Sequence, residues 1–362
     1  MGCLIWADDI LLMSKSEEGL KNMLLALGKY SEENGMTINT KKTQTIIFNK
    51  GGRHIRRNFL VENDRLESTR EYRYLGFVVT PSGEINTGLK DLKNRALRAF
   101  SKLKKKMGVY FRKYPLIAIK LFRSLVEPIL LYASDFWGIL KMQTNNPIEN
   151  SFMSFCKQLL GVQKQTSNVG VLLELGHIPL MILAQKSAIK NWVRIATKTK
   201  CNDLVQDSYH FSATENLNWS SSIHNKLSTI GLADLFHSKD NDTHLKATQR
   251  STDIFHQEAF ADIKREDTKL RTYGTIKKEK GYETYLSKIT SIKQRRALTK
   301  FRLSNSVLMI EKGRHSNIDK SLRFCPFCSD KIEDEKHFLL ECFVYKYLRS
   351  EMYREIKIRD RR

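Results

Sequence analysis

Two adjacent acidic residues near the N-terminus are the first candidates for chemistry. Asp8 and Asp9 separate two apolar runs, residues 4–7 and 10–13. This pattern predicts a buried β-hairpin with the carboxylates at its tip, although a short buried helix has the same pattern. Paired carboxylates on a rigid turn can hold divalent cations that act in phosphoryl or nucleotidyl transfer. The plain alternative is that the two acids belong to an ordinary turn or cap.

A second set of potential ligands lies near the C-terminus. Cys325 and Cys328 stand two residues apart, and His337 and Cys342 follow nine and fourteen positions after Cys328. Two thiolates on a tight turn, an imidazole and a third thiolate can close a tetrahedral Zn²⁺ site. The last two ligands would lie on a helix at i and i+5, which requires a slightly relaxed turn. The alternative is that the cysteines are free.

Composition indicates a folded chain with a polyanionic partner. The sequence has 362 residues, 41% of them hydrophobic, and a net charge of +23. These values fit two or three domains with a sizeable core, and they favour nucleic acid as a partner, with an anionic membrane as the rival. The sequence contains no signal-like leader and no apolar run of about 18 residues, so we expect a soluble intracellular protein.

The segment from Lys90 to Arg123 concentrates the positive charge. It contains twelve Lys or Arg residues and one acid, Asp91. Apolar residues at helical spacing predict an amphipathic helix over 89–107 with a basic outer face, and a second helix after Pro115. The candidate phosphate contacts are Lys93, Arg98, Lys102, Lys104, Lys105 and Lys106. The alternative is a solvated basic surface without a ligand.

The region between the acidic pair and this basic segment has a mixed pattern. We expect a helix over 17–34, because apolar residues recur there at helical spacing, with a serine before it and Gly35 after it. Strands are predicted at 36–39 and 44–48. Another extended segment is predicted at 72–79, around a Tyr-Leu-Gly turn.

Three motifs in this order resemble those of reverse transcriptases. An aromatic-Ala-Asp-Asp motif, an Asn-x-x-Lys-Thr motif and a Tyr-Leu-Gly primer-grip turn follow one another, and the first has Trp where the family usually has Tyr or Phe. Three motifs in register are more specific than one. The matching residues are Trp6, Ala7, Asp8 and Asp9, then Asn39, Lys42 and Thr43, then Tyr74, Leu75 and Gly76.

The resemblance implies a role for each motif. Asp8 and Asp9 would be catalytic and would hold Mg²⁺, and Lys42 would donate a proton near the leaving pyrophosphate. Residues 74–76 would hold the primer end. The partners would be an RNA template, a DNA primer and the RNA–DNA duplex, and the basic helix over 89–107 would be the polymerase thumb.

Later segments resemble the polymerases of non-LTR retrotransposons. These are a Pro-x-x-x-Tyr-x-x-x-x-Trp motif from Pro128 to Trp137, the segment 174–180, and the C-terminal Cys-Cys-His-Cys group. The resemblance implies an α+β fold, in which a small remnant of a palm sheet precedes a mostly helical thumb and connection and a zinc knuckle. His177, which has no partner for catalysis nearby in sequence, is interpreted as structural.

The expected domains are a partial palm at 1–84, a thumb with following helices at 85–196, a helical connection at 197–310, and a zinc knuckle with a basic tail at 311–362. Within the connection, residues 197–222 read as a connector with little core of its own, and 295–303 as a short helix with a basic face.

The sequence also departs from the family, since the fingers and an earlier palm Asp are not seen. We therefore expect the chain to be inactive alone, although the intact element would be an RNA-directed DNA polymerase that acts in the nucleus. The alternative is a basic, zinc-containing nucleic-acid-binding protein without turnover. The oligomeric state is left open.

Overall fold

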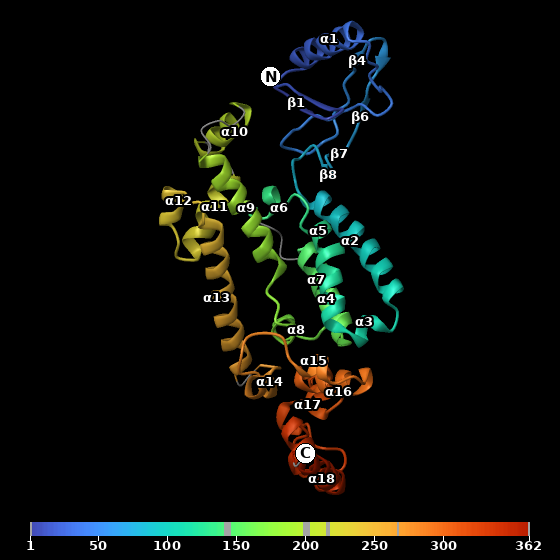
Figure 1. The fold of residues 1–362 in the computed structure, drawn as a ribbon, viewed down its shortest axis with the longest axis vertical. Helices are drawn as coiled ribbons and strands as arrows, with labels where there is room; N and C mark the ends of the chain where they lie inside the picture. The colour runs from blue at the N-terminus through green and yellow to red at the C-terminus, as the bar shows by residue number, and fades with distance from the viewer. Residues whose placement is uncertain (1, 141–145, 198–202, 215–217, 266–267, 361–362) are drawn as a thin grey trace. The chain divides into compact units, whose positions relative to one another are not determined.

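The computed structural model describes residues 2–140, 146–197, 203–214, 218–265 and 268–360. The described strands form four sheets of two strands each, and helices make up most of the remainder. Figure 1 shows the strands in the N-terminal part of the chain and helices along the rest of it. The expected α+β class with a mostly helical C-terminal region is confirmed.

The chain divides into two compact units, and neither is a single stretch of sequence. Unit 1 consists of Met1–Leu97, Ile129–Ile148 and Ala184–His244. Unit 2 consists of Arg98–Pro128, Glu149–Leu183 and Leu245–Arg362. Each unit therefore depends on packing between segments that are far apart in sequence.

The N-terminal hairpin has the predicted form. Strand β1 (Gly2–Trp6) pairs antiparallel with β2 (Asp9–Met13), and Trp6 lies opposite Asp9. Ala7 at the tip takes a left-handed conformation with φ of 53°. The hairpin is only partly buried, and the side chains of Ile5 and Trp6 are 68% and 67% exposed. A sheet of two strands has too few neighbours to cover both of its faces.

Helix α1 (Glu17–Glu33) follows the hairpin and confirms the prediction for 17–34. The side chain of Ser16 accepts a hydrogen bond from the backbone N–H of Gly19, and Gly35, with φ of 65°, follows the end of the helix. The helix and the hairpin share one small core. Its buried members are Leu24, Phe59, Val61 and Leu66, with Leu12, Leu20, Ile38 and Ile47 packed against them.

The strand predicted at 36–39 is wrong, and the one at 44–48 is shorter than expected. Residues 36–39 are irregular, because the backbone turns at Asn39, whose carbonyl accepts hydrogen bonds from the N–H groups of Lys42 and Thr43. Strand β3 covers only Gln44–Thr45 and pairs in parallel with β6 (Glu67–Ser68). A further small hairpin joins β4 (Leu60–Val61) to β5 (Asp64–Arg65).

The extended segment at 72–79 is confirmed as a hairpin, and a long helix follows it. Strand β7 (Tyr72–Tyr74) pairs antiparallel with β8 (Phe77–Val79). Helix α2 (Asn86–Met107) then presents the predicted apolar stripe. The buried residues of this stripe are Leu89, Leu92, Ala96, Phe100 and Leu103.

Unit 2 begins with an aromatic core. Short helix α3 (Tyr110–Lys113) precedes α4 (Pro115–Leu125), which confirms the helix predicted after Pro115. Phe100 from α2 and Phe122 from α4 pack with Phe155 of α7 (Pro147–Leu160), and the rings of Phe122 and Phe155 are stacked with centroids 3.8 Å apart. Such rings bury a large apolar area and fix the helices against one another.

The remaining helices of unit 1 include much of the expected connector at 197–222. Apart from 198–202 and 215–217, which lie outside the described residues, this stretch is helical. Ile223 and Leu227 are fully buried at a spacing of four, and their polar neighbours cover the outer face. The helices are α5 (Glu127–Leu130), α6 (Ser134–Trp137), α9 (Leu180–Thr197), α10 (Asp203–Thr214), α11 (Asn218–Thr229) and α12 (Asp234–Ser238).

The rest of unit 2 lies in Glu149–Leu183 and in Leu245–Arg362. Its helices are α8 (Asn168–Leu175), α13 (Thr243–Lys264), α14 (Arg271–Ile276), α15 (Tyr285–Lys288), α16 (Ile292–Arg302), α17 (Met309–His315) and α18 (Lys346–Asp360). Three short turns of other helix types also belong to it, η1 (Lys320–Leu322), η2 (His337–Glu341) and η3 (Phe343–Tyr345).

The basic surface predicted for the helix at 295–303 is wrong for two of its arginines. Arg295 and Arg302 of α16 are 5% and 8% exposed. Arg302 forms ion pairs with Glu174 (2.7 Å) and Glu283 (2.9 Å), and Arg295 donates to the carbonyls of Leu286 and Ile289. Two carboxylates allow the guanidinium group of Arg302 to be buried, and backbone carbonyls satisfy that of Arg295.

No single described helix is long and apolar enough to span a membrane. Helices α8 and α9, bent by 76° where they join, meet the length and composition criteria only as a pair.

Candidate functional site

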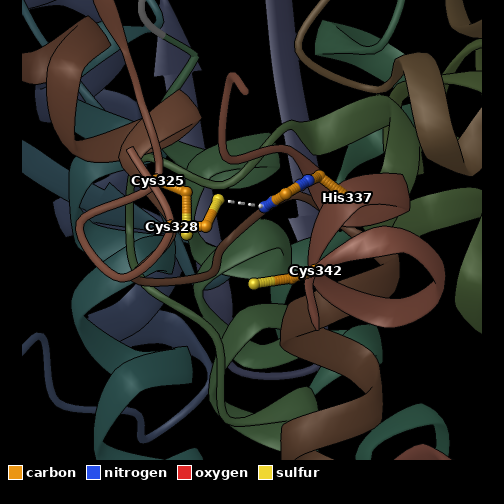
Figure 2. Close-up of side chains that lie close together, drawn as sticks. All are labelled: Cys325, Cys328, His337 and Cys342. Carbon is orange, nitrogen blue, oxygen red and sulfur yellow. Dashed lines mark hydrogen bonds between the residues drawn. The ribbon is translucent and has the colours of Figure 1, made fainter. Parts of the chain in front are cut away.

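Three thiols and one imidazole come together near the C-terminus. The potential ligand atoms of Cys325, Cys328, His337 and Cys342 all lie within 4.8 Å of one another. Figure 2 shows the four side chains pointing toward a common centre, with Sγ of Cys328 3.3 Å from Nε2 of His337. Cys325, His337 and Cys342 are buried, so the ligands are held by the protein interior.

A tight turn positions the first two cysteines. The backbone N–H of Cys325 donates to the carbonyl of Lys331 (2.8 Å), and the N–H of Ser329 donates back to the carbonyl of Cys325 (2.8 Å). Ser329 takes a left-handed conformation with φ of 57°, which closes the turn. The turn is therefore fixed by backbone hydrogen bonds, and the two thiols face the same side.

A π-helical turn positions the other two ligands. η2 (His337–Glu341) is a π-helix, and the N–H of Cys342 donates to the carbonyl of His337 at 2.8 Å. The carboxylate of Asp334 accepts from the N–H of His337 at 2.7 Å and holds the start of the turn. A π-turn closes an i to i+5 hydrogen bond, which is the relaxed geometry that the spacing of the two ligands required.

The electrostatics of the cluster fit a soft, tetrahedrally coordinated metal ion such as Zn²⁺. Burial raises the pKa of the Cys325 thiol, whereas hydrogen bonds from the backbone amides of Asp330 and Lys331 lower the pKa of Cys328. A metal ion would replace the protons of these thiols. Nδ1 of His337 is buried and has no hydrogen-bond partner among the described residues, so Nε2 is the ring nitrogen that faces the cluster.

The acidic pair lies at the tip of the first hairpin. Asp8 is in the turn, Asp9 begins β2, and both are exposed. Among the described residues, the cysteine–histidine cluster is the only group of three or more His, Cys, Asp or Glu side chains placed to hold a metal ion. The carboxylates of Asp8 and Asp9 thus form a pair of oxygen ligands without a third in the described structure.

Lys42 follows the turn at Asn39. Its N–H is bound by both the carbonyl (3.0 Å) and the side-chain oxygen (3.1 Å) of Asn39, and its ammonium group is exposed. Ile38 in this turn and Leu12 of β2 pack on the same small core. The core therefore supports both motifs, but Lys42 forms no hydrogen bond or ion pair with the acidic pair in the described structure.

The predicted primer-grip turn, Tyr74-Leu75-Gly76, is held by two residues that sequence analysis did not assign to it. The Tyr132 hydroxyl donates to the carbonyl of Leu75, and Nη2 of Arg95 donates to the carbonyl of Gly76 at 2.7 Å. Leu75 and Gly76 have φ of 44° and 83°. The left-handed conformation is uncommon for Leu75 but suits Gly76, and the two hydrogen bonds hold the carbonyls of both residues.

Asp91 extends the support to the neighbouring strand. Its carboxylate accepts two hydrogen bonds from Arg73 of β7 (2.8 and 2.7 Å) and pairs with Nε of Arg95 (2.9 Å). Partial burial alone would raise the pKa of Asp91, but the bonds from Arg73 and the charge of Arg95 hold it below its ordinary value. A single acid one turn before an arginine in a basic helix is the sequence signal that could have revealed this role.

The predicted nucleic-acid contacts lie along α2 and remain predictions. Arg98, Lys102, Lys104, Lys105 and Lys106 are exposed, and Lys93 is half-buried. The ammonium of Lys104 donates to the side chain of Gln158 at 2.8 Å. Among the described residues, no carboxylate pairs with the lysines at 102, 105 and 106, so their charge is available to a ligand.

His177 lies inside unit 2, where its side chain packs beside Phe152. Its Nδ1 is 3.1 Å from Nη2 of Arg123. Burial, together with the charge of Arg123, lowers the pKa of His177 to about 4, so the ring is neutral near pH 7 and accepts this hydrogen bond. The environment is that of a core residue.

Comparison with known proteins identifies a family that the first part of the chain resembles. Residues 1–79 match the family model described as "Reverse transcriptase (RNA-dependent DNA polymerase)". This segment contains the acidic pair, the Asn-x-x-Lys-Thr motif and the Tyr-Leu-Gly turn. The expected resemblance to reverse transcriptases is therefore confirmed for these residues. Neither the curated proteins nor the solved structures gave a match.

Proposed function

We propose that this chain contains the late palm, the thumb and the zinc knuckle of an RNA-directed DNA polymerase of a non-LTR retrotransposon. One observation carries the proposal: residues 1–79 match reverse transcriptases, and the last hairpin of that segment is tied through Asp91 and Arg95 to the basic helix α2. A primer-grip turn joined directly to a thumb helix would place primer and duplex on one support.

In this proposal the first hairpin carries the metal ligands. Asp8 and Asp9 offer the carboxylate oxygens that Mg²⁺ prefers. Bound there, Mg²⁺ would stabilise charge on the attacking and leaving oxygens of nucleotidyl transfer. Lys42 would donate a proton to the leaving pyrophosphate, and its exposed ammonium group is free to approach a phosphate.

Helix α2 would grip the RNA–DNA duplex through phosphates. Its buried stripe fixes one face in the core, and this leaves Arg98, Lys102, Lys105 and Lys106 on the exposed side. Phosphate contacts carry no sequence code, so the helix would hold duplexes of any sequence. Lys104, which already bonds Gln158, would contribute less than its neighbours.

The knuckle would hold Zn²⁺ and contact single-stranded nucleic acid. Phe327 lies between the first two cysteines and is 59% exposed, so its ring is open to a base. Stacking on an exposed aromatic ring is tolerant of sequence, as a polymerase that copies a long template requires.

The decisive experiment measures duplex binding as a function of salt. The test variant changes Lys102, Lys104, Lys105 and Lys106 to Gln. In a plot of log binding constant against log salt concentration, we expect its slope to be flatter by about two to three, at about 0.7 to 0.9 per lost phosphate contact. The matched control changes four exposed lysines elsewhere, Lys278, Lys288, Lys293 and Lys312, to Gln, which gives the same net charge. Equal slopes for the two variants would remove α2 from the binding surface.

A second candidate function is nucleic-acid binding without turnover. It is favoured by a difference between the sites. The acidic pair has no third ligand among the described residues, whereas the cysteine–histidine cluster contains four potential ligands and α2 carries exposed basic side chains. Primer extension on an RNA template with Mg²⁺ and deoxynucleotides separates the two functions. Extension that is lost in Asp8→Asn identifies a polymerase, and duplex binding without any extension identifies a binding protein.

A further inference from the structure

Two tyrosines form an exposed stacked pair just beyond the C-terminal end of the basic helix α2. Tyr110 opens α3, and Tyr114 follows its last residue. The two rings are nearly parallel, with an interplanar angle of 13° and centroids 5.9 Å apart. The residues are 54% and 44% exposed. Aromatic rings are enriched in cores and at interfaces, so a stacked pair in solvent indicates a contact surface.

The short helix that carries the pair is fixed from its inner side. Phe111 of α3 is buried, and its ring packs 5.8 Å from that of Phe100. The buried guanidinium group of Arg295 donates to the carbonyls of Arg112 and Lys113, the second at 3.3 Å. The backbone that presents the two tyrosines is therefore held in place before any ligand arrives, which lowers the entropic cost of binding.

The surroundings of the pair in sequence are basic. Residues 92–126 contain no Asp or Glu. Lys105 and Lys106 at the end of α2 are exposed, as is Lys113, whose ammonium group lies over the ring of Tyr114 at 5.7 Å from its centroid. Cations that reach phosphates and aromatic faces that stack on bases are the combination that binds single-stranded nucleic acid.

The shape of the pair distinguishes this ligand from other partners of a basic surface. Two parallel rings offer a flat outer face, on which a third flat ring can stack. A nucleobase provides such a ring together with an anionic backbone, whereas a lipid chain or an acidic peptide provides only one of the two features. The charge and the geometry thus favour unpaired nucleotides over a membrane or a protein.

We propose that Tyr110 and Tyr114 form a stacking platform for the unpaired bases of a strand that leaves the duplex on α2. The inference rests on the proposed grip of a duplex by α2 and adds the path of its single-stranded extension. The chain turns once between the last lysines of α2 and the pair, at Gly108 with φ of 52°. The platform therefore begins where the phosphate-binding helix ends. Every base has a face that can stack, so the extension can have any sequence.

The test compares three RNA–DNA duplexes of equal paired length by fluorescence anisotropy. One is blunt, one has an unpaired RNA extension and one an unpaired DNA extension, each of about six nucleotides. The measured quantity is the ratio of the Kd for the blunt duplex to the Kd for an extended one. We expect a ratio of about ten for at least one extension, and that extension identifies the strand that reaches the platform.

Two variants of the pair separate the rings from their hydroxyl groups. Tyr110→Ala, Tyr114→Ala should bring the ratio close to one, whereas Tyr110→Phe, Tyr114→Phe should keep it, since stacking depends on the ring. The slope of log binding constant against log salt concentration should stay the same in the alanine variant, because a ring that stacks on a base releases no counterion.

The matched control changes two comparably exposed aromatic residues outside the platform, Tyr30→Ala and Phe48→Ala, and should retain the ratio. Tyr30 is 54% exposed and Phe48 is 58% exposed. If the unmodified protein binds no duplex, the proposed grip by α2 is wrong, and the same variants are then measured on a single-stranded oligonucleotide. A loss of affinity in the alanine variant but not in the control would still support the platform.

Three outcomes would overturn the proposal. In the first, the ratio survives in the alanine variant of the pair and disappears in Phe327→Ala, which would assign the unpaired bases to the knuckle. In the second, the pair and the control lose equal affinity. In the third, neither extension nor the single strand depends on the pair, and vesicles of phosphatidylcholine and phosphatidylserine do, which would identify a membrane-binding surface instead.

Discussion

The conformation of Gly76 connects the Tyr-Leu-Gly turn to a residue 56 positions later in the chain. Its φ of 83° suits glycine, and a Cβ at this position would meet the ring of Tyr132 at 3.2–3.3 Å. Glycine is therefore favoured at this position for two reasons, the left-handed backbone and the close approach of the Tyr132 side chain. At the scale of single residues, the cost of backbone strain and the cost of the steric contact can be separated by experiment.

We expect Gly76→Ala to destabilise the protein by about 2 kcal/mol or more, because it adds a steric contact to the backbone strain. The control is Gly83→Ala. Gly83 also has a left-handed φ, of 72°, but no atom within 4 Å of an added Cβ, so its cost should be about 1 kcal/mol. Urea unfolding measures both values.

The excess cost should disappear in a Tyr132→Ala background, where the added Cβ of residue 76 has no ring to meet. If Gly76→Ala and Gly83→Ala lower the free energy of unfolding equally with Tyr132 in place, the contact with Tyr132 does not contribute to stability.

The carboxyl group of Glu149 predicts a dependence of stability on pH. Burial raises its pKa to about 7, and hydrogen bonds from the N–H groups of Met181 and Leu180 oppose this only in part. The folded state therefore holds the proton more tightly than the unfolded state, whose pKa is near 4.5. The free energy of unfolding should fall as pH rises from about 4.5 to 7, and remain constant above that range.

Glu149→Gln should remove this fall, which amounts to about 1–3 kcal/mol, and urea unfolding at several pH values measures it. In the variant, the opposite effect of His177 becomes visible. Its pKa of about 4 is below the ordinary value of 6.5, so stability should fall as pH drops from 6.5 to 4. A variant that loses stability with rising pH as the unmodified protein does would show that Glu149 is not the group responsible.

At the scale of elements, the knuckle combines two local structures that are short on their own. A turn closed by Cys325 and Ser329 provides two thiols, and the π-turn of η2 provides His337 and Cys342. Neither contains enough apolar surface to be stable alone. A metal ion that joins all four ligands would supply the missing stabilisation, because ligand binding and folding are coupled in small sites.

We expect one Zn²⁺ per chain, and loss of the local helical structure around residues 337–342 on chelation. Elemental analysis gives the stoichiometry, and amide hydrogen exchange reports the local structure. The variant Cys325→Ser, Cys328→Ser should lose the metal, whereas Cys3→Ser, which changes an exposed cysteine outside the cluster, should retain it. Protein prepared with zinc that contains none, or a double variant that retains it fully, would contradict the site.

At the scale of the whole molecule, the chain passes between two units more than once. Unit 1 has a small core around Leu24 and Val61 in its N-terminal part, and unit 2 has the aromatic cluster around Phe122. Two compact units of this kind unfold independently unless a large apolar interface couples them. The cysteine–histidine cluster and the Tyr-Leu-Gly turn belong to different units.

Calorimetry should therefore resolve two unfolding transitions. We expect chelation of the metal to lower only the transition of unit 2, and Gly76→Ala to lower only that of unit 1, since each change acts on contacts within one unit. The expected shift for Gly76→Ala is several degrees, from about 2 kcal/mol in a unit of this size. A single transition that moves with both changes would show that the units fold cooperatively.

The local features of this protein could be predicted from its sequence. The cap at Ser16, the apolar stripe of α2, the hairpin tip at Asp8 and the metal-binding spacing each depend on residues within about one or two turns of one another. The need for a relaxed turn between His337 and Cys342 was visible because five positions do not fit an α-helix.

The polar groups that bond a distant segment could not be predicted in this way, because long-range packing selects them. The Tyr132 hydroxyl supports a turn 57 residues earlier, and Arg302 is buried because Glu174 lies 128 residues before it. A charged residue has the same sequence pattern whether its partner is water or a buried carboxylate, and long-range packing alone determines which of the two it meets.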